Sequence, residues 1–277
     1  MQAKEGDVAI QLALSQSMLQ QGVPFPRLTK TKTGDLYARD HENRMWILSD
    51  FVEGAYFTGM RQQLDAVARA IAALQDQLEK SAEAQQLPLF SAVNSWDGTA
   101  AIFNELFAKE NSWAEFFPAT EKDALLRERA VLERIFQKTR DYLKTSSSQI
   151  VPIHIDLHPH NILIGEQGAP VIVDIDSLQR ADRVQSLSFA IFKLVRQHIV
   201  QERPSDLAAP AREFFKQLNI AEADIPLYAA KATAEVLRRI GIIASLNMHK
   251  ANRDWNAVLH IQLAALHEIP HVFATKE

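Results

Sequence analysis

The chain has 277 residues, of which 47% are hydrophobic, enough for one two-lobed unit or two small domains with a substantial core. It carries a formal net charge of −4, so neither nucleic acid nor an anionic membrane is expected as its main partner. The absence of cysteine excludes disulfides, a thiolate zinc site and a cysteine nucleophile. No apolar run is long enough to span a bilayer and the start, MQAKEGD, is not apolar, so a cytoplasmic protein is expected.

Most of the chain outside its centre is predicted to be helical, because apolar residues recur there at helical spacing. The clearest case is a stripe of five apolar residues that would share one helix face: Leu64, Val67, Ile71, Leu74 and Leu78. The predicted helices, in chain order, cover residues 8–19, 61–80, 122–143, 187–200, 206–218, 225–248 and 254–268.

The centre of the chain is predicted to form a strand, a loop and a β-hairpin. Residues 150–153 are a short apolar strand that cannot continue through Pro159, because proline lacks the backbone donor that a central strand needs. A hairpin follows, with strands at residues 161–164 and 170–173 and a turn between them that contains two glycines. Since the two ends of a hairpin lie close together, polar residues at its entry and exit are expected to meet.

Three polar residues are expected to meet there: Asp156 in the loop, Asn161 at the hairpin entry and Asp174 at its exit. An amide and a carboxylate that converge from the two ends of one hairpin suit a hard, oxygen-preferring cation such as Mg²⁺. Asp156 lies five residues before Asn161, far enough to face an attacking hydroxyl instead of the metal. Phosphoryl transfer from ATP requires this set of groups: a carboxylate that accepts a proton, and a metal site that holds the phosphates.

The residues HIDLHPHNILI, followed by VIVDID, resemble the catalytic core of the aminoglycoside phosphotransferase and choline kinase family. These proteins are small-molecule kinases with a protein-kinase-like fold. The resemblance implies that Asp156 is the catalytic aspartate and that Asn161 and Asp174 are the magnesium ligands. It also implies that His154 braces the loop and that Asp176, a second acid, supports the metal site or the substrate.

Upstream of this core the resemblance continues more weakly. Residues 22–26, Gly-Val-Pro-Phe-Pro, resemble the family's segment after its first helix. Residues 31–36 read as a hairpin turn, and residues 45–54 as the strand that runs into the hinge between the lobes. In such folds the hinge backbone pairs with adenine, which here implicates Ser49, Asp50 and Phe51.

The implied architecture is α+β and protein-kinase-like. Residues 1–53 would form a reduced N-terminal, nucleotide-binding lobe with few antiparallel strands, together with the hinge. Residues 54–277 would form a large, mainly helical C-terminal lobe that carries the catalytic loop and the substrate site. The implied activity is ATP- and Mg²⁺-dependent phosphorylation of a hydroxyl on a small molecule, of the amino alcohol, sugar or aminoglycoside class.

The front of the chain departs from the family pattern. None of the nine glycines lies in a G-x-G-x-x-G run, and Lys4 is the only lysine before Lys30. Residues 8–19 contain no glutamate and offer Gln11 and Gln16 instead, so the lysine–glutamate pair that grips the phosphates cannot be assigned. Either the chain as given begins downstream of its natural start, or the protein has lost that half of its nucleotide clamp. The main alternative function is therefore a non-catalytic kinase-like protein that binds a ligand or partner.

A third interpretation is metal-dependent hydrolysis, with His154, His158 and His160 joining Asp156 as metal ligands. Pro159 interrupts the alternation that would place these side chains on one face. His158 is therefore interpreted as a hydrogen-bonding residue that supports the loop.

Two further sets of side chains could recognise a substrate. Aromatic faces attract ammonium groups, which suggests a role for the tryptophans Trp96, Trp113 and Trp255. Acids on the C-terminal helices could attract an amine: Glu235, Asp254 and Glu268. More often, such tryptophans pack between helices and such acids form a solvated face.

Overall fold

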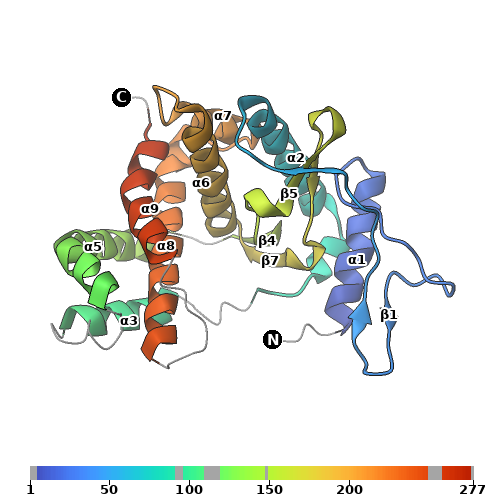
Figure 1. The fold of residues 1–277 in the computed structure, drawn as a ribbon, viewed down its shortest axis with the longest axis horizontal. Coiled ribbons are helices and arrows are strands. Elements are labelled where there is room, and N and C mark those ends of the chain that lie inside the picture. Colours follow the sequence, from blue (N-terminus) through green and yellow to red (C-terminus); the bar gives the residue numbers. More distant parts are fainter. Residues whose placement is uncertain (1–4, 91–95, 109–118, 147–148, 249–257, 276–277) are drawn as a thin grey trace. The chain divides into compact units, whose positions relative to one another are not determined.

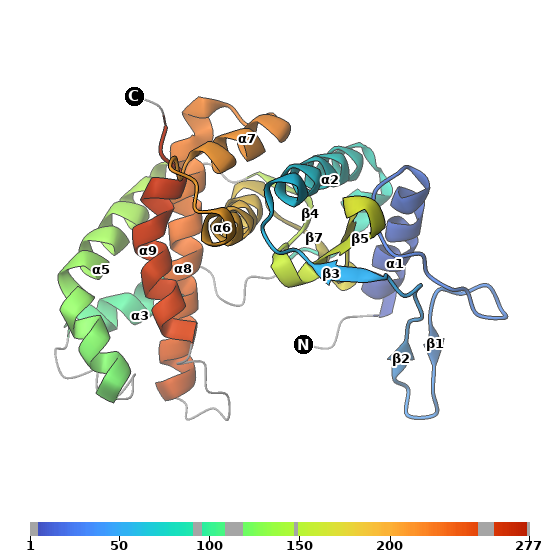
Figure 2. The same cartoon turned by 45° about the horizontal axis from the view of Figure 1, so that its top comes forward.

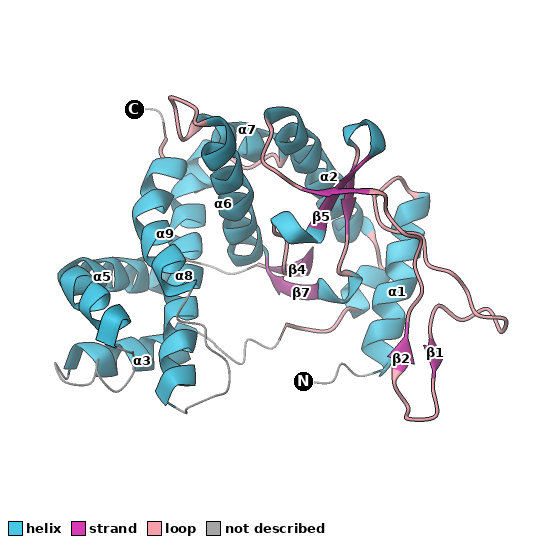
Figure 3. Cartoon of the chain, in the orientation of Figure 1, coloured by secondary structure: helices cyan, strands magenta, loops and turns pink. Residues whose placement is uncertain are grey.

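The computed structural model describes residues 5–90, 96–108, 119–146, 149–248 and 258–275. The protein is mixed α+β: helices carry most of the described chain, and the strands are short and paired antiparallel (Figures 1 and 3). The predicted α+β class is therefore confirmed. In the described ranges, no helix is both long enough and apolar enough to cross a membrane.

The chain divides into two compact units. One consists of residues 1–90 and 148–222, and the other of residues 91–147 and 223–277. The first unit contains all the described strands and the predicted catalytic residues, whereas the described part of the second is helical. These units are defined by how the chain packs, whereas the predicted boundary at residue 53 separates a nucleotide-binding lobe from a substrate-binding lobe. That boundary stays a prediction.

Two of the sheets in the first unit are two-stranded. β1 (Ala38–Arg39) pairs with β2 (Met45–Trp46). β4 (Ile150–His154) pairs with β7 (Leu178–Asp182), so the predicted strand before the catalytic loop is present and lies against a strand that follows the hairpin.

The third sheet contains the predicted hairpin. Its order is β3–β5–β6, with β5 (Ile162–Gly165) at the centre, β3 (Gly54–Tyr56) on one side and β6 (Pro170–Ile172) on the other. The register pairs Ile162 with Ile172, which brings the residues just outside the hairpin next to each other. The hairpin was therefore predicted correctly, and β3 adds a strand from more than a hundred residues earlier.

The predicted strand at residues 45–54 is interrupted. β2 covers only its first two residues, a single bridge then joins Ser49 to Leu28, and β3 begins at the last predicted residue. Residues 31–36 do form a turn, but β1 and β2 pair across the next turn along the chain. The Asp40 carboxylate closes that second turn by accepting hydrogen bonds from the main-chain N–H groups of Glu42 and Arg44. This local interaction places the hairpin turn after residue 39 instead of at residues 31–36.

The helices of the first unit are α1 (Glu5–Gln20), α2 (Arg61–Lys80), α6 (Arg183–Glu202) and α7 (Ala209–Gln217). α2 has the predicted bounds, and its predicted apolar stripe is buried. The other three begin and end within about one turn of the prediction. α6 starts at its N-cap, Asp182, whose side chain accepts a hydrogen bond from the third helical residue.

Within the described residues, the helices of the second unit are α3 (Trp96–Ala108), α5 (Ala119–Thr145), α8 (Ile225–Met248) and α9 (Leu259–Val272). α8 packs against the other three, and Figure 2 shows α8 and α9 side by side. α8 has the predicted bounds, whereas α3 was not predicted. The first residues of the helix predicted at 254–268 lie outside the described ranges.

Trp96 packs within the second unit. Its ring stacks on Phe136 with the centroids 5.6 Å apart, and Phe136 stacks in turn on Phe103 at 5.3 Å. For this tryptophan the packing role is therefore confirmed. Trp113 and Trp255 lie outside the described residues.

Gly59 connects β3 to α2 in a conformation that only glycine adopts easily. Its φ is +93°, and a Cβ there would lie 2.5 Å from the carbonyl oxygen of Gln197 on α6.

Gly59→Ala is expected to lower the free energy of unfolding by about 3 kcal/mol, because it adds a clash with backbone to the strain of a positive φ. Urea unfolding measures this loss. Gly34→Ala is the matched control: φ there is +94° with open space around it, so about 1 kcal/mol is expected. Equal losses in both variants would contradict the clash.

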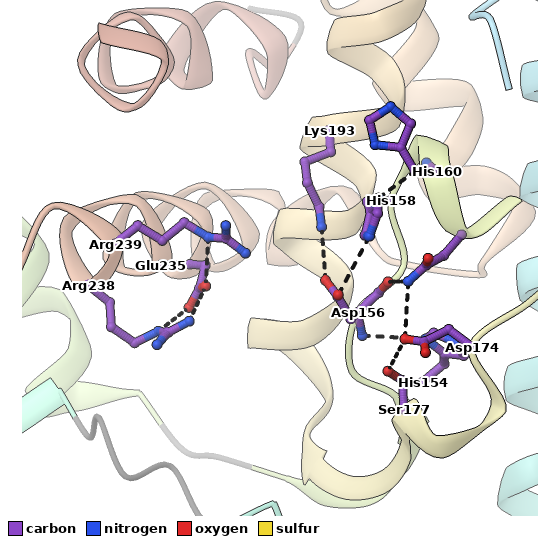
Figure 4. Close-up of polar contacts among 11 residues, drawn as sticks. His154, Asp156, His158, His160, Asp174, Ser177, Lys193, Glu235, Arg238 and Arg239 are labelled. Carbon is purple, nitrogen blue, oxygen red and sulfur yellow. Dashed lines mark hydrogen bonds and ion pairs between the residues drawn. The ribbon is translucent and has the colours of Figure 1, made fainter. Parts of the chain in front are cut away.

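Glu235, one of the acids considered for substrate binding, is buried in the second unit and paired. Its carboxylate accepts hydrogen bonds from Arg238 (2.6 and 2.7 Å) and Arg239 (3.1 Å), as Figure 4 shows. Burial raises the pKa of Glu235, but the two arginines outweigh burial and hold that pKa below its usual value. Glu235 is thus accounted for by structure. Asp254 lies outside the described residues.

Glu235→Gln is expected to lower the free energy of unfolding by about 2 kcal/mol at pH 7, because Arg238 keeps its burial and loses its counter-ion. The folded pKa lies below the unfolded value of about 4.3. The stabilisation is therefore present above that pH and is lost as the pH falls through the folded value. Urea unfolding from pH 7 down to about pH 3.5 should show the difference shrinking at the acid end. Glu133→Gln, an exposed position on α5, is the control, and a difference independent of pH would contradict the assignment.

Candidate active site

His154, the last residue of β4, is buried beneath the predicted catalytic loop. Its Nδ1 accepts a hydrogen bond from the main-chain N–H of Asp156 (3.4 Å), so Nε2 carries the ring proton and donates to the carbonyl oxygen of Val173 (3.1 Å). Burial lowers the pKa of His154 and favours the neutral ring. One neutral side chain thus connects the loop to the hairpin exit, as a bracing role requires.

Asn161 joins the two ends of the hairpin. It is the last residue of a single 3₁₀ turn, η3 (Pro159–Asn161). The ring of His158, which precedes this turn, accepts a hydrogen bond from the main-chain N–H of His160. Nδ2 of Asn161 donates to the main-chain oxygen of Asp156 (2.9 Å) and to Oδ2 of Asp174 (3.3 Å). The side chain of Asn161 thus contacts the main chain of Asp156 and the carboxylate of Asp174, so the three residues lie close together, while the Asp156 carboxylate itself contacts Lys193 and His158.

Asp174 leaves the hairpin in the left-handed backbone conformation (φ 68°, ψ 55°), which aspartate tolerates better than most residues. The N–H of Val173 donates to the carbonyl oxygen of Asn161 (3.0 Å), and this bond holds the exit against the entry. The hydroxyl of Ser177 donates to Oδ2 of Asp174 (2.5 Å) and sets the direction of the carboxylate (Figure 4).

Asp176 lies beside Asp174, within the short turn η5 (Ile175–Ser177). Burial raises the pKa of Asp176 to about 6, and the Asp174 carboxyl acts in the same direction through a hydrogen bond and its charge. Two neighbouring carboxyl groups, next to the side-chain amide of Asn161, are stabilised by added positive charge. This set of oxygen donors therefore fits a hard divalent cation.

The carboxylate of Asp156 lies between two basic side chains. Its Oδ1 is 3.5 Å from Nζ of Lys193 on α6, and its Oδ2 is 3.5 Å from Nε2 of His158 (Figure 4). The carboxylate remains 46% exposed, so a ligand can reach it. Sequence reasoning missed Lys193, although a charged residue inside the most apolar part of a predicted helix was a usable signal.

Gln11 lies on α1, the helix that contains no glutamate to pair with a phosphate-binding lysine, and its side chain is 3% exposed. Its Nε2 donates to the carbonyl oxygens of Asp176 (2.7 Å) and Leu178 (2.8 Å), more than 160 residues later. α1 is thereby fastened to the segment that carries the two hairpin acids. Side chains from both elements line a pocket of about 190 Å³.

The three predicted hinge residues differ in their surroundings. Ser49 lines this same pocket, together with Asp174 and Asp176. Asp50 forms an ion pair with Arg27 (2.9 Å), and the side chain of Phe51 is 88% exposed. Hence Ser49 lies at the candidate site. The side chain of Asp50 is paired with Arg27, and that of Phe51 is in solvent.

The three histidines considered for a hydrolase do not direct their rings at one shared point. The His154 ring bonds to main-chain groups of Asp156 and Val173, and His158 contacts the Asp156 carboxylate. The ring of His160 lies nearly perpendicular to the rings of Tyr56 and His158, with centroids 5.5 and 5.7 Å away. Throughout the part of the chain that the structure describes, no group of three or more His, Asp or Glu side chains is arranged to hold a metal ion. A metal-hydrolase centre therefore finds no support in this geometry.

The short-stranded α+β fold and the convergence of Asp156, Asn161 and Asp174 are features of kinase-like phosphotransferases. A family model described as the phosphotransferase enzyme family, APH, matches residues 3–212, well over half of the chain. The chain belongs to this family, and the predicted resemblance is confirmed. No curated protein matched the sequence.

Solved structures share the fold at low sequence identity. An aminoglycoside phosphotransferase from Alicyclobacillus acidocaldarius is 16% identical, with a TM-score of 0.69 over 98% of this chain and 82% of that one. The AMP complex of spectinomycin phosphotransferase, APH(9)-Ia, is 15% identical, with a TM-score of 0.64 over 97% and 84%. A choline/ethanolamine kinase family protein from Mesorhizobium loti is 12% identical, with a TM-score of 0.59 over 98% and 80%. These likenesses confirm the protein-kinase-like fold.

Proposed function

We propose that the protein is an ATP- and Mg²⁺-dependent phosphotransferase that phosphorylates a hydroxyl of a small molecule. The observation that carries this proposal is the side chain of Asn161, which bonds both to the loop of Asp156 and to the carboxylate of Asp174. The loop that carries the proposed proton acceptor is thereby tied to the candidate metal site. Family membership supports the same chemistry.

Each residue has a separate part in the proposed reaction. The oxygen of the acceptor hydroxyl attacks the γ-phosphorus of ATP, a new O–P bond forms, and the bond to the β,γ-bridging oxygen breaks to release ADP. Asp156 orients the hydroxyl and takes its proton. Asn161 and Asp174 would hold Mg²⁺, and Asp176 supports that site. The bound ion would neutralise charge on the phosphates.

Related solved structures support a nucleotide and a divalent cation as ligands. Spectinomycin phosphotransferase was solved with ADP and spectinomycin, and the amicoumacin kinase hAmiN with AMP-PNP and Ca²⁺. The pocket that Ser49 lines, next to Asp174, is the proposed nucleotide site, and Ser49 is the predicted hinge residue that lies at its wall. Of the acceptor classes, amino alcohols, sugars and aminoglycosides are all retained.

A non-catalytic kinase-like binding protein is the second candidate, and one observation favours it. Both hydrogens of the Gln11 amide go to main-chain oxygens, so this residue does not reproduce a phosphate-gripping lysine–glutamate pair.

Two measurements distinguish the candidates. Calorimetric titration with ATP, with and without Mg²⁺, tests nucleotide binding, and ADP release over a panel of amino alcohols, sugars and aminoglycosides tests transfer. Acceptor-dependent ADP release is expected, and release without acceptor is the control for hydrolysis. Nucleotide binding without transfer to any acceptor would favour the second candidate. No binding at millimolar Mg²⁺ and ATP would overturn the kinase proposal for this chain.

A further inference from the structure

Lys193 reaches the proposed catalytic loop from a different element. It lies on α6, 37 residues after Asp156, and its Nζ is 3.5 Å from Oδ1 of that residue. The lysine side chain is only 20% exposed, which is unusual for this residue type. Figure 4 shows it pointing at Asp156 from above, on the opposite side from Asp174.

The position of Lys193 is set by packing. Its ammonium lies 5.0 Å from the ring centroid of Phe189, one helical turn earlier, so the ring and the carboxylate both attract it. Leu194 and Val195, the next residues, are fully buried, and α6 also packs against β4 and the η3 turn. The packing of α6 therefore fixes the backbone of Lys193, and the contacts of its ammonium with the ring and the carboxylate restrict its side-chain rotamers.

Stability alone gives little reason for this contact. Asp156 is 46% exposed, and an ion pair at 3.5 Å with a partly solvated carboxylate contributes about 1 kcal/mol or less. Burying most of a lysine offsets part of even that gain. A function through the carboxylate is the better account.

The two oxygens of Asp156 have different neighbours. Lys193 is on Oδ1 and His158 on Oδ2, while Asn161 bonds to the main-chain oxygen and His154 to the main-chain N–H. A hydroxyl that replaces His158 at Oδ2 would leave the Lys193 contact intact. Lys193 thus keeps Oδ1 occupied by positive charge, and Oδ2, which contacts His158, is the oxygen that a proton donor would approach.

We propose that Lys193 is a positioning residue that holds Asp156 by Oδ1, so that Oδ2 faces the acceptor hydroxyl. This inference rests on the proposed function, because Asp156 must be the proton acceptor for the contact to matter. Lys193 acts through Asp156 and is not part of the nucleotide pocket. Its removal should therefore slow transfer without weakening ATP binding.

A double-mutant cycle tests the proposal, with Lys193→Met, Asp156→Asn and the double variant. Lys193→Met is expected to lower kcat by about 10- to 100-fold, with KM for ATP and the affinity for Mg²⁺ and AMP-PNP within about 2-fold of wild type. The double variant should be no slower than Asp156→Asn alone, because a residue that acts through Asp156 has no effect once that carboxylate is gone. Lys193→Arg should recover part of kcat, since it restores the charge.

The matched control is the pair Asp76–Lys80 on α2, an exposed aspartate–lysine ion pair at 2.6 Å. Lys80→Met, Asp76→Asn and their double variant should leave kcat unchanged. Unchanged AMP-PNP binding by Lys193→Met shows that the variant is folded, and loss of that binding would overturn the proposed role.

The remaining outcomes are also decisive. An active wild type with an unaffected Lys193→Met variant, or losses that add in the double variant, would overturn the positioning role and leave the proposed function standing. A wild type that binds no nucleotide and transfers no phosphoryl group would overturn both.

Discussion

Asp156→Asn is expected to lower kcat by about 1,000-fold, while the affinity for Mg²⁺ and nucleotide stays within about 2-fold of wild type. The substitution removes the proton acceptor but keeps the shape of the side chain, and the nucleotide contacts proposed above come from other residues. Steady-state ADP release gives kcat, and calorimetric titration with AMP-PNP gives the affinity. The exposed Asp76→Asn variant, which removes the same charge on α2, should behave like wild type.

Loss of turnover and of nucleotide affinity in equal measure would argue against this role for Asp156. It would indicate that the carboxylate contributes to binding the metal–nucleotide complex. A fully active Asp156→Asn variant would remove the proposed proton acceptor altogether. In that case the interaction with Asn161 would remain a structural feature of the loop.

Asp174→Ala is expected to reduce Mg²⁺-dependent nucleotide affinity by about 100-fold or more. The carboxylate is the charged member of the proposed metal pair, and alanine offers no ligand in its place. The measurement is a titration with ATP at fixed Mg²⁺, repeated in EDTA, where wild type and variant should converge. Convergence in EDTA is the sign that the lost affinity depends on the metal.

Asp174 lies in the left-handed backbone region, so alanine also introduces strain there. Gln167 provides the matched control, because it is an exposed residue of the same hairpin with φ 62°. Gln167→Ala should show similar strain and normal nucleotide affinity. If both variants lost affinity equally, strain in the hairpin would explain the effect and Asp174 would lose its assignment as a ligand.

Several long-range contacts converge on the hairpin exit. His154 bonds to the carbonyl of Val173, and Gln11 bonds to the carbonyl of Asp176 from a helix at the other end of the first unit's sequence. The carboxylates are thus aimed by contacts to the main chain on both sides of Asp174. Such support is what a site needs if its ligands are to stay in position without a bound cation.

Local chemistry determined the parts of the fold that the sequence predicted well. Pro159 ends a strand and two glycines close a turn, so the loop and the hairpin after it follow from backbone rules. The apolar stripe predicted the bounds of α2, because the apolar residues of a helix that buries one face recur about every 3.6 residues. The predicted meeting of Asn161 and Asp174 follows from the hairpin itself.

Only the tertiary structure decided which side chains from distant elements join these residues. Helical periodicity predicts that α6 buries a face, but not that Lys193 meets Asp156, since that depends on how the helix packs against β4 and η3. Likewise, nothing local to Gln11 predicts a bond to Asp176. The physical reason is range: turns and periodicity act over a few residues, whereas these contacts join residues 37 and 165 positions apart through packing.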